Sequence, residues 1–259
     1  MLDVWGSIEL QDLGREGYRR FGVPVGGAFD LEAHLMANSL VENAGTCSTL
    51  ELAMAQVVLS ASDDTTVALA GAQSQVSVDD VPVQRSRFPV HSGQVLRIEP
   101  PQQGARTYLA IRGGFDGQFV LGSRSGTRIK RGDQLVCAQE PESHSKPIAH
   151  DQRDELEICP GPWAELIKPE DLTHRVFRAS TKMNRVGIRV EGAISDRHRE
   201  ITSEPACFGG IQLTPSGELI ILGPDGPTIG GYPIIAVVKP SSRSTLAQLR
   251  PGDPIQFLY

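Results

Sequence analysis

The sequence predicts a mainly β protein with two β-rich halves and a few short helices. Its apolar segments are short and are bounded by Gly, Pro, Ser or Asp, which is typical of a chain that turns often. The 27 glycines and 18 prolines among 259 residues are too few for a disordered chain. One pattern also recurs: a Gly and a polar residue precede alternating apolar positions at His91–Ile98, Lys130–Cys137 and Arg250–Phe257. Three such strand starts favour β-barrels over a parallel sheet with helices.

The expected strands are short apolar runs. In chain order they are Val67–Ala70, Gln94–Ile98, Tyr108–Ile111, Gln134–Cys137, Glu155–Ile158, Val176–Phe177, Ile188–Val190, Ile211–Leu213, Leu219–Leu222 and Ile234–Val238. The segment Leu213–Leu219 predicts a hairpin, because Pro215-Ser-Gly217 has turn composition between two apolar runs.

The clearest helix is expected near residues 31–43. Asp30 can cap its start, Glu32 lies favourably in the first turn, and Gly45 follows the expected end. An apolar stripe on this helix would consist of Leu31, Leu35, Met36 and Leu40. Two shorter helices are expected at Pro162–Ile167, which has proline at its first position, and at Ser242–Leu249.

The two halves are predicted as residues 1–140, with the helix near 31–43, and residues 155–259. The polar stretch between them, Glu140–Asp154, contains two prolines and is interpreted as a link.

Charge and composition exclude several function classes. The net charge of −6 argues against nucleic acid or anionic lipid as a partner, because both need excess Lys and Arg. No run approaches the roughly 18 apolar residues of a membrane helix, and the N-terminus lacks a signal-peptide pattern. Four cysteines without CxxC spacing and six histidines without ligand spacing predict no metal site and a cytoplasmic chain with reduced, buried thiols. His34 could face a site from the helix, but a surface or packed histidine is favoured.

A first candidate site stretch is Gln11–Asp30, which contains five glycines. Gly26 and Gly27 would let the backbone approach a ligand closely. Arg15 offers a planar donor fork for a carboxylate or phosphate, and Asp30 offers a carboxylate. The alternative is a set of tight turns in which Asp30 only caps the helix.

A second candidate stretch is Asp225–Pro233. Asp225, Thr228 and Tyr232 would place an acid, a hydroxyl and a phenol on one loop. The alternative is a β-turn whose tyrosine packs. Standard catalytic signatures are missing: in Gly122–Gly126, which resembles a nucleophile elbow, the central residue is Arg124 instead of Ser.

A series of motifs runs in order along nearly the whole chain. It comprises Asp12–Arg15, Gly22–Asp30, Asn38–Asn43, Leu50–Glu51, Gly71–Ala72, Tyr108–Gly114, Leu121–Ser125, Arg189–Gly192, Ser203–Pro205, Gly210–Gln212, Gly230–Pro233 and Leu246–Asp253. In these motifs the chain resembles one family, which includes the C subunit of bacterial ATP-dependent 5-oxoprolinase, KipA, allophanate hydrolase subunit 2 and half of the carboxyltransferase domain of urea carboxylase. The resemblance covers both halves as one family domain.

The resemblance implies a cyclophilin-like β-barrel architecture and a heteromeric hydrolase. The partners would be a KipI-like and a LamB/YcsF-like subunit, and the reaction would be ATP-driven opening of 5-oxoproline to glutamate. Arg15, Arg124 and Asn38 are then the expected phosphate donors. Asp30 and Asp225 are the expected acid and base.

Two other functions stay open. One is a carboxyltransferase component acting with carboxybiotin on urea or a related amide, with the biotin on another chain. The other is a regulatory protein that binds a KipI-like kinase inhibitor. Gly226 and Pro227 stand where the family pattern has arginine and glutamine, and this loss of donors makes the regulatory alternative more credible.

Overall fold

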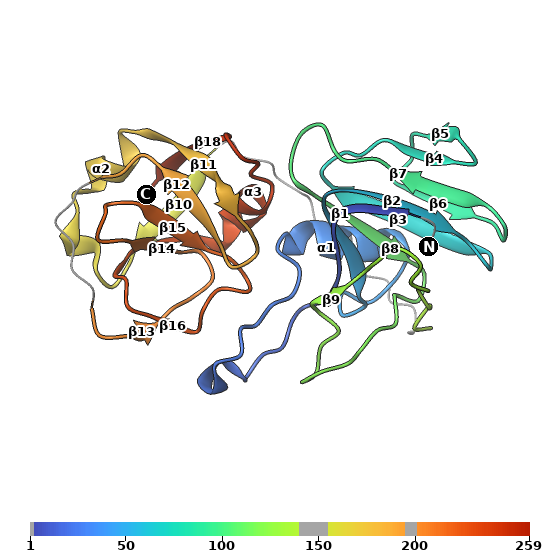
Figure 1. The fold of residues 1–259 in the computed structure, drawn as a ribbon, viewed down its shortest axis with the longest axis horizontal. Helices are drawn as coiled ribbons and strands as arrows, with labels where there is room; N and C mark the ends of the chain where they lie inside the picture. Colours follow the sequence, from blue (N-terminus) through green and yellow to red (C-terminus); the bar gives the residue numbers. More distant parts are fainter. Residues whose placement is uncertain (1–2, 140–154, 195–200) are drawn as a thin grey trace. The chain divides into compact units, whose positions relative to one another are not determined.

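The computed structural model describes residues 3–139, 155–194 and 201–259, so the predicted link Glu140–Asp154 lies outside the described residues. The chain divides into two compact units (Figure 1). The first unit comprises Met1–Arg15 and Asp30–Asp151, and the second comprises Glu16–Phe29 and Gln152–Tyr259. Strands dominate both units, which confirms the mainly β prediction.

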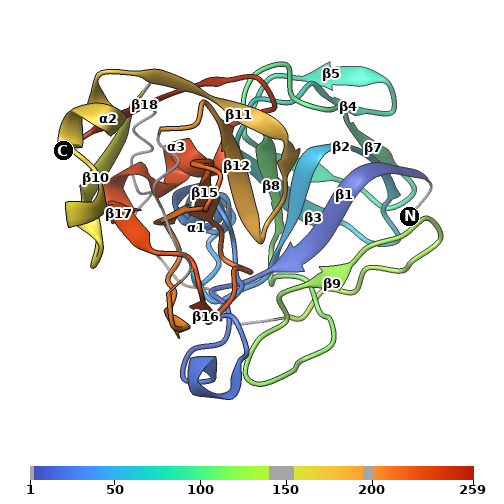
Figure 2. The same ribbon diagram turned by 60° about the vertical axis from the view of Figure 1, so that its left-hand side comes forward.

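The first unit is built on one nine-stranded sheet. Its strands are β1 (Asp3–Gln11), β2 (Thr49–Ser60), β3 (Thr65–Gly71), β4 (Val76–Val78), β5 (Val81–Val83), β6 (Arg87–Val90), β7 (Val95–Ile98), β8 (Arg106–Ile111) and β9 (Thr127–Arg128). They follow the order β5-β4-β7-β2-β8-β3-β6, and β1 pairs with both β2 and β9 (Figure 2). Alternate residues of these strands bury a core that includes Leu50, Leu52, Leu96 and Leu109.

The longest strand, β2, was not among the predicted strands. Its Leu-Glu-Leu-Ala-Met-Ala run is rich in strong helix formers, but pairing with β1, β7 and β8 overrides that preference. The β1–β2 register shifts between Trp5 and Ser7. Gly6 lies there with φ +90°, and a Cβ on it would come within 2.8 Å of Ala55, so only glycine fits this bulge.

Helix α1 (Leu31–Leu40) starts where the sequence predicts, with the Asp30 side chain accepting a 3.1 Å hydrogen bond from the Ala33 amide. The predicted apolar stripe is wrong. The buried face consists instead of Ala33, His34, Ala37 and Asn38, whereas Leu31 is 47% exposed. Small and polar residues let the helix pack closely on β3 and β8.

The second unit contains a closed seven-stranded barrel in the order β10-β17-β14-β15-β12-β11-β18 (Figure 1). These strands are β10 (Leu156–Pro160), β11 (Val176–Met183), β12 (Gly187–Glu191), β14 (Gly210–Leu213), β15 (Leu219–Leu222), β17 (Ile234–Val238) and β18 (Pro254–Leu258). Strands β13 (Glu204–Pro205) and β16 (Ile229–Gly230) form a separate pair. Leu213 pairs with Leu219, which confirms the predicted hairpin.

Helices in the second unit are short. Helix α2 (Pro169–Thr173) was not predicted, α3 (Arg243–Ala247) confirms the last predicted helix, and Pro162–Ile167 contains only the 3-10 helix η2 (Ala164–Leu166). Further 3-10 turns are η1 (Arg19–Phe21) and η3 (Pro240–Ser242).

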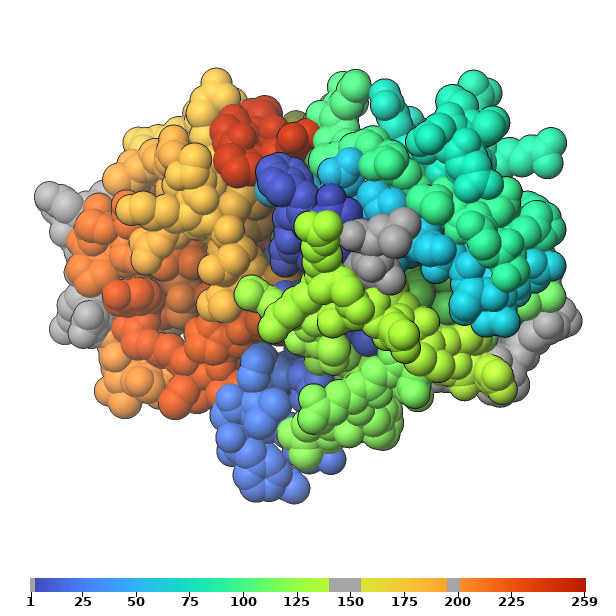
Figure 3. Space-filling view, turned by 45° about the vertical axis from the view of Figure 1, so that its right-hand side comes forward, coloured from blue at the N-terminus to red at the C-terminus, as the bar shows by residue number. Residues whose placement is uncertain are grey.

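Two of the three recurrent strand-start patterns lead into strands, β7 and β18. The third, Lys130–Cys137, does not: Cys137 makes an isolated bridge to Phe115, and the alternating position Val136 is 59% exposed. The strand predicted at Gln134–Cys137 is therefore wrong: Leu135 packs against the core, but the segment makes only this one bridge and no ladder. Residues 116–139 run over the surface of the first unit (Figure 3, green to yellow-green).

Candidate functional site

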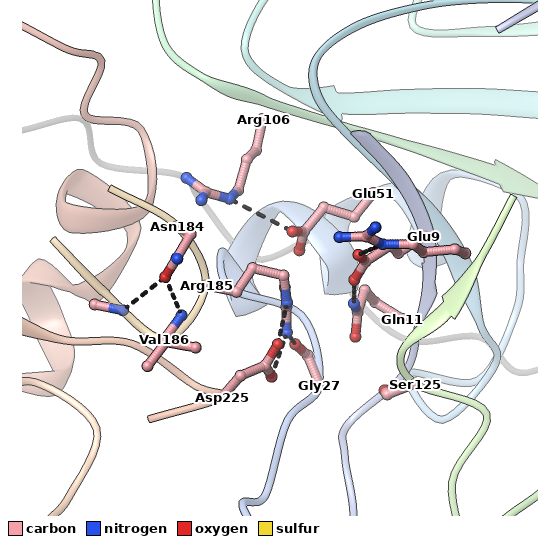
Figure 4. Close-up of polar contacts among 12 residues, drawn as sticks. Glu9, Gln11, Gly27, Glu51, Arg106, Ser125, Asn184, Arg185, Val186 and Asp225 are labelled. Atoms are coloured by element: carbon pink, nitrogen blue, oxygen red, sulfur yellow. Dashed lines mark hydrogen bonds and ion pairs between the residues drawn. The ribbon is translucent and has the colours of Figure 1, made fainter. Parts of the chain in front are cut away.

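A buried chain of hydrogen bonds holds the start of α1 in the first unit. The Asp30 amide donates to the Tyr108 hydroxyl (2.8 Å), which donates to a Glu51 carboxylate oxygen (2.6 Å). Arg106 pairs with the other oxygen of Glu51 at 3.4 Å (Figure 4). Burial, with the negative charges of Glu51 and Asp30, raises the pKa of Tyr108 well above its ordinary value. The phenol therefore stays a hydrogen-bond donor at physiological pH.

A second buried polar group lies further along α1. The ring of His34 contacts the Thr49 hydroxyl and the Gly45 carbonyl, both at 2.9 Å, and burial lowers its pKa. Of the two expected placements, surface or packed, the structure shows the packed one. Asn38 donates to the Cys47 carbonyl (2.9 Å) and accepts from Asn43 (3.0 Å). These hydrogen bonds fix the Asn38 side chain inside the first unit. Its role as a phosphate donor stays a prediction.

Asp12 organises a loop cluster in the same unit. Its buried carboxylate accepts hydrogen bonds from the hydroxyls of Ser123 and Ser125 and from the amides of Arg124 and Gly14. Burial raises the pKa of this carboxyl, but the hydrogen bonds outweigh burial and the net pKa is lowered.

Two predicted phosphate donors, Arg15 and Arg124, meet at this cluster. Arg15 donates to the Ser125 carbonyl at 2.8 Å. Arg124 pairs with Asp116 at 3.3 Å and stacks over the Phe119 ring. The structure thus brings these two arginines together, although both already serve internal contacts.

The second unit brings Gly26, Gly27 and Asp225 together through Arg185. Two guanidinium nitrogens of Arg185 contact the two carboxylate oxygens of Asp225, at 2.8 and 3.1 Å, and one of them also donates to the Gly27 carbonyl (Figure 4). The Gly26 amide donates to the Pro224 carbonyl at 3.1 Å. We call this group the Arg185 clamp.

Close backbone approach shapes the clamp. A Cβ on Gly223 would lie 2.1 Å from the Arg185 carbonyl oxygen, and one on Gly226 would lie 2.9 Å from the Gly223 oxygen. A side chain at position 226 would therefore require the backbone of this loop to shift.

The remaining predicted residues lie further along this loop. Thr228 uses its carbonyl to accept from the Ala206 amide (3.0 Å), and Tyr232 is half-buried. The buried Gln212 side chain lies against Gly230, where a Cβ would come within 2.7 Å of its amide nitrogen. Catalytic roles for Asp30 and Asp225 stay predictions, as do ligand contacts by Thr228 and Tyr232.

The clamp is suited to bind an anion. A bidentate carboxylate fixes the plane of a guanidinium, and a fixed guanidinium recognises phosphate or carboxylate groups. Glycine-rich backbone beside it can approach such a group closely. Arg185 was missed as a site residue, because it lies far in sequence from the loops that it joins.

Other site types find less support among the described residues. There, no cluster of three or more His, Cys, Asp or Glu side chains could hold a metal ion, and no helix is long and apolar enough to cross a membrane.

All four cysteines are free. Cys47 is buried, but Cys137 and Cys207 are exposed, so the expectation of buried thiols is wrong for these two.

An open cavity of about 1060 Å³ lies in the first unit. Leu96 and Leu109 are among the residues that line it, and none of the predicted site residues does.

Comparison with known proteins identifies the family. Residues 21–259 match the family described as carboxyltransferase domain, subdomain A and B. The chain is 33% identical to the C subunit of 5-oxoprolinase from Escherichia coli, over 96% of this chain and 87% of that protein. It is 31% identical to the C subunit of 5-oxoprolinase from Haemophilus influenzae, over 99% of this chain and 89% of that protein.

A solved structure is also similar. The crystal structure of the Kluyveromyces lactis urea amidolyase superposes with a TM-score of 0.88 at 26% identity, covering 99% of this chain and only 18% of that one. Sequence and structure agree over almost the full length, and the chain belongs to the family of carboxyltransferase domains, subdomains A and B.

Proposed function

We propose that this chain is a non-autonomous subunit of an ATP-dependent 5-oxoprolinase. The observation that carries the proposal is the match to two 5-oxoprolinase C subunits, at 31–33% identity over 87–89% of their length. The other members would be a KipI-like and a LamB/YcsF-like subunit, and we expect the complex in the cytoplasm, where ATP is available.

The proposed reaction opens a lactam, which is a poor electrophile. Transfer of the ATP γ-phosphoryl group to the lactam carbonyl oxygen would release ADP and activate the ring carbon. One water would then add to that carbon, and cleavage of the C–N bond would leave an acyl phosphate of glutamate. A second water would hydrolyse this acyl phosphate to glutamate and inorganic phosphate. Such a reaction needs fixed cationic donors for phosphate and a group that accepts the proton of water.

The Arg185 clamp offers the first requirement in the second unit. The Arg185 side chain is 13% exposed and its guanidinium is held by two contacts to Asp225, so the orientation of the guanidinium is set in advance of any anion. Asp30 and Asp225 are the proposed proton acceptors. The sequence contains no Walker A motif. The other members of the complex are therefore proposed to contribute to the ATP site.

The test is reconstitution. The chain is purified together with a KipI-like and a LamB/YcsF-like subunit, and glutamate release from 5-oxoproline is measured with and without ATP. We expect ATP-dependent release, at least tenfold lower for Arg185→Lys, which loses the bidentate fork. The matched control is Arg178→Lys, because Arg178 is exposed on the same barrel. A stable complex without turnover would contradict the proposal and favour the regulatory alternative.

A carboxyltransferase role is the second candidate, favoured by the family description and by the likeness to urea amidolyase. Under that alternative, carboxybiotin on another chain would supply the carboxyl group. Transfer of labelled bicarbonate carbon to urea, in the presence of a biotin carboxylase and a biotin carrier, distinguishes it from the leading proposal.

A further inference from the structure

The loops around Asp12 expose an apolar surface on the first unit. Leu13 is 43% exposed, Phe119 63%, Val120 43% and Leu121 42%. These four residues are here called the hairpin surface. They lie on two adjoining loops, because Arg15 donates to the Val120 carbonyl at 3.4 Å. Single exposed apolar residues are normal, but four adjoining ones mark an interaction surface.

The backbone at the tip of this surface is strained. Val120 and Ser123 exchange backbone hydrogen bonds of 2.8 and 3.2 Å, so Leu121 and Gly122 form a two-residue turn. Both have positive φ, 52° and 84°. Such turns strongly favour Asn-Gly, and leucine is disfavoured at positive φ. An exposed leucine in this position does not serve the stability of the isolated chain.

The hairpin surface is also rigid. The buried Asp12 carboxylate receives the Ser123 and Ser125 hydroxyls at 2.6 Å from one loop and the Gly14 amide at 2.8 Å from the other. Both loops are therefore fixed before any partner arrives. A surface that is ordered in advance loses less entropy on binding.

Charge around the hairpin surface differs from that of the whole protein. The segment from Phe115 to Gln139 contains four basic and two acidic residues, whereas the chain carries −6. The Arg124 guanidinium stacks on Phe119 at 5.3 Å and pairs with Asp116, and the Arg128 side chain, which pairs with Glu9, is 77% exposed. The net positive charge of this segment is complementary to an apolar recess bordered by carboxylates.

We propose that the hairpin surface is where a second polypeptide of the complex docks, through an apolar recess bordered by acidic residues. The inference rests on the proposed function in one respect, since the partner is taken to be the KipI-like subunit. In the urea amidolyase structure the matching domain is only 18% of a longer chain. A domain that works joined to so much other polypeptide needs an interface, and contact with another polypeptide accounts for an exposed leucine with strained backbone at position 121.

The experiment compares three variants of the full chain in calorimetric binding to a purified KipI-like subunit. Leu121→Asn places the residue best suited to this turn at its tip, so the variant should melt at or above the wild-type temperature. We expect its affinity for the KipI-like subunit to fall at least tenfold, and that of Phe119→Ser to fall similarly. Val81→Ser, at a residue 66% exposed on β5 of the same unit, should bind within twofold of wild type.

Other outcomes overturn the proposal. If both hairpin variants bind the KipI-like subunit within twofold of wild type, or if Val81→Ser weakens binding as much, the partner docks elsewhere. Absence of binding by the wild-type chain also overturns it. If the hairpin variants instead lose binding to anionic vesicles or to single-stranded RNA and keep the KipI-like subunit, the surface serves a membrane or a nucleic acid.

The same samples separate this inference from the proposed function. Normal assembly of the hairpin variants into a complex that releases glutamate refutes the docking surface alone. Assembly that depends on the hairpin, without ATP-dependent glutamate release, refutes the 5-oxoprolinase reaction alone.

Discussion

Replacing Tyr108 by phenylalanine removes one buried oxygen and leaves the ring in place. The Glu51 oxygen at 2.6 Å and the Asp30 amide at 2.8 Å both lose their hydrogen bond to the tyrosine hydroxyl. Removing one partner of a buried hydrogen bond costs about 1–3 kcal/mol. Two such bonds, one of them to a carboxylate, predict a loss of about 2–5 kcal/mol in the free energy of unfolding of the first unit. The corresponding drop in melting temperature is roughly 5–15 °C.

The two tryptophans allow this loss to be located. Trp5 lies in the first unit and Trp163 in the second, so single-tryptophan versions (Trp163→Phe and Trp5→Phe) report the two units separately during urea unfolding. We expect Tyr108→Phe to lower the midpoint of the Trp5 transition with an unchanged slope. The Trp163 transition should not move. Tyr259→Phe, at an exposed residue, is the control.

A shift of less than about 0.5 kcal/mol in the Trp5 transition would refute the reasoning, since ordinary surface substitutions reach that size. Equal shifts in both transitions would show that the loss is not confined to the first unit. Glu51→Gln in the Tyr108→Phe background then completes a double-mutant cycle, in which the second substitution should cost less than it does alone.

Three further predictions follow from individual groups. The lowered pKa of Asp12 means that its stabilising effect is complete above about pH 4 and is lost as the pH falls through the folded-state pKa; Asp12→Asn should flatten acid unfolding there. Burial lowers the pKa of His34, so the folded state resists protonation and stability should fall as the pH drops below about 6.5, a slope that His34→Gln removes. Gly223→Ala places a Cβ 2.1 Å from the Arg185 carbonyl and should cost about 1–3 kcal/mol in chemical unfolding; Gly231→Ala, where the nearest atom would be 3.4 Å away, should cost little.

Short apolar runs revealed most of the barrel, because buried strands bounded by turns leave a local signal. The hairpin at Leu213–Leu219 is one such case. The start of α1 was predictable for another local reason, because Asp30 is a residue type that caps helices. Strand β2 was missed since its residues favour helices locally and only its neighbours β1, β7 and β8 make it a strand. The stripe on α1 was wrong for a related reason: a helix that packs closely against strands buries small residues, and periodicity of large residues does not reveal this.

The candidate site was predictable in its loops and not in its contacts. Glycine-rich segments mark positions of close approach, and Gly26, Gly27 and Asp225 do meet. The residue that joins them, Arg185, is 40 positions from Asp225 and 158 from Gly27 in sequence. Likewise Tyr108 is 78 residues from Asp30. Without an observed fold, no local pattern connects such partners.

The departure from the family pattern at Gly226 now has a physical account. The sequence alone suggested that the second loop had lost a guanidinium. In the structure the turn is so tight that a Cβ at position 226 would meet the Gly223 carbonyl at 2.9 Å, while Arg185 reaches the loop from the β11–β12 connection and binds both oxygens of Asp225. A guanidinium therefore remains at this loop even though position 226 is a glycine. The missing arginine is then a weaker argument against activity than it was on sequence grounds, and Arg185 becomes the residue on which the choice between an enzyme component and a purely regulatory protein depends.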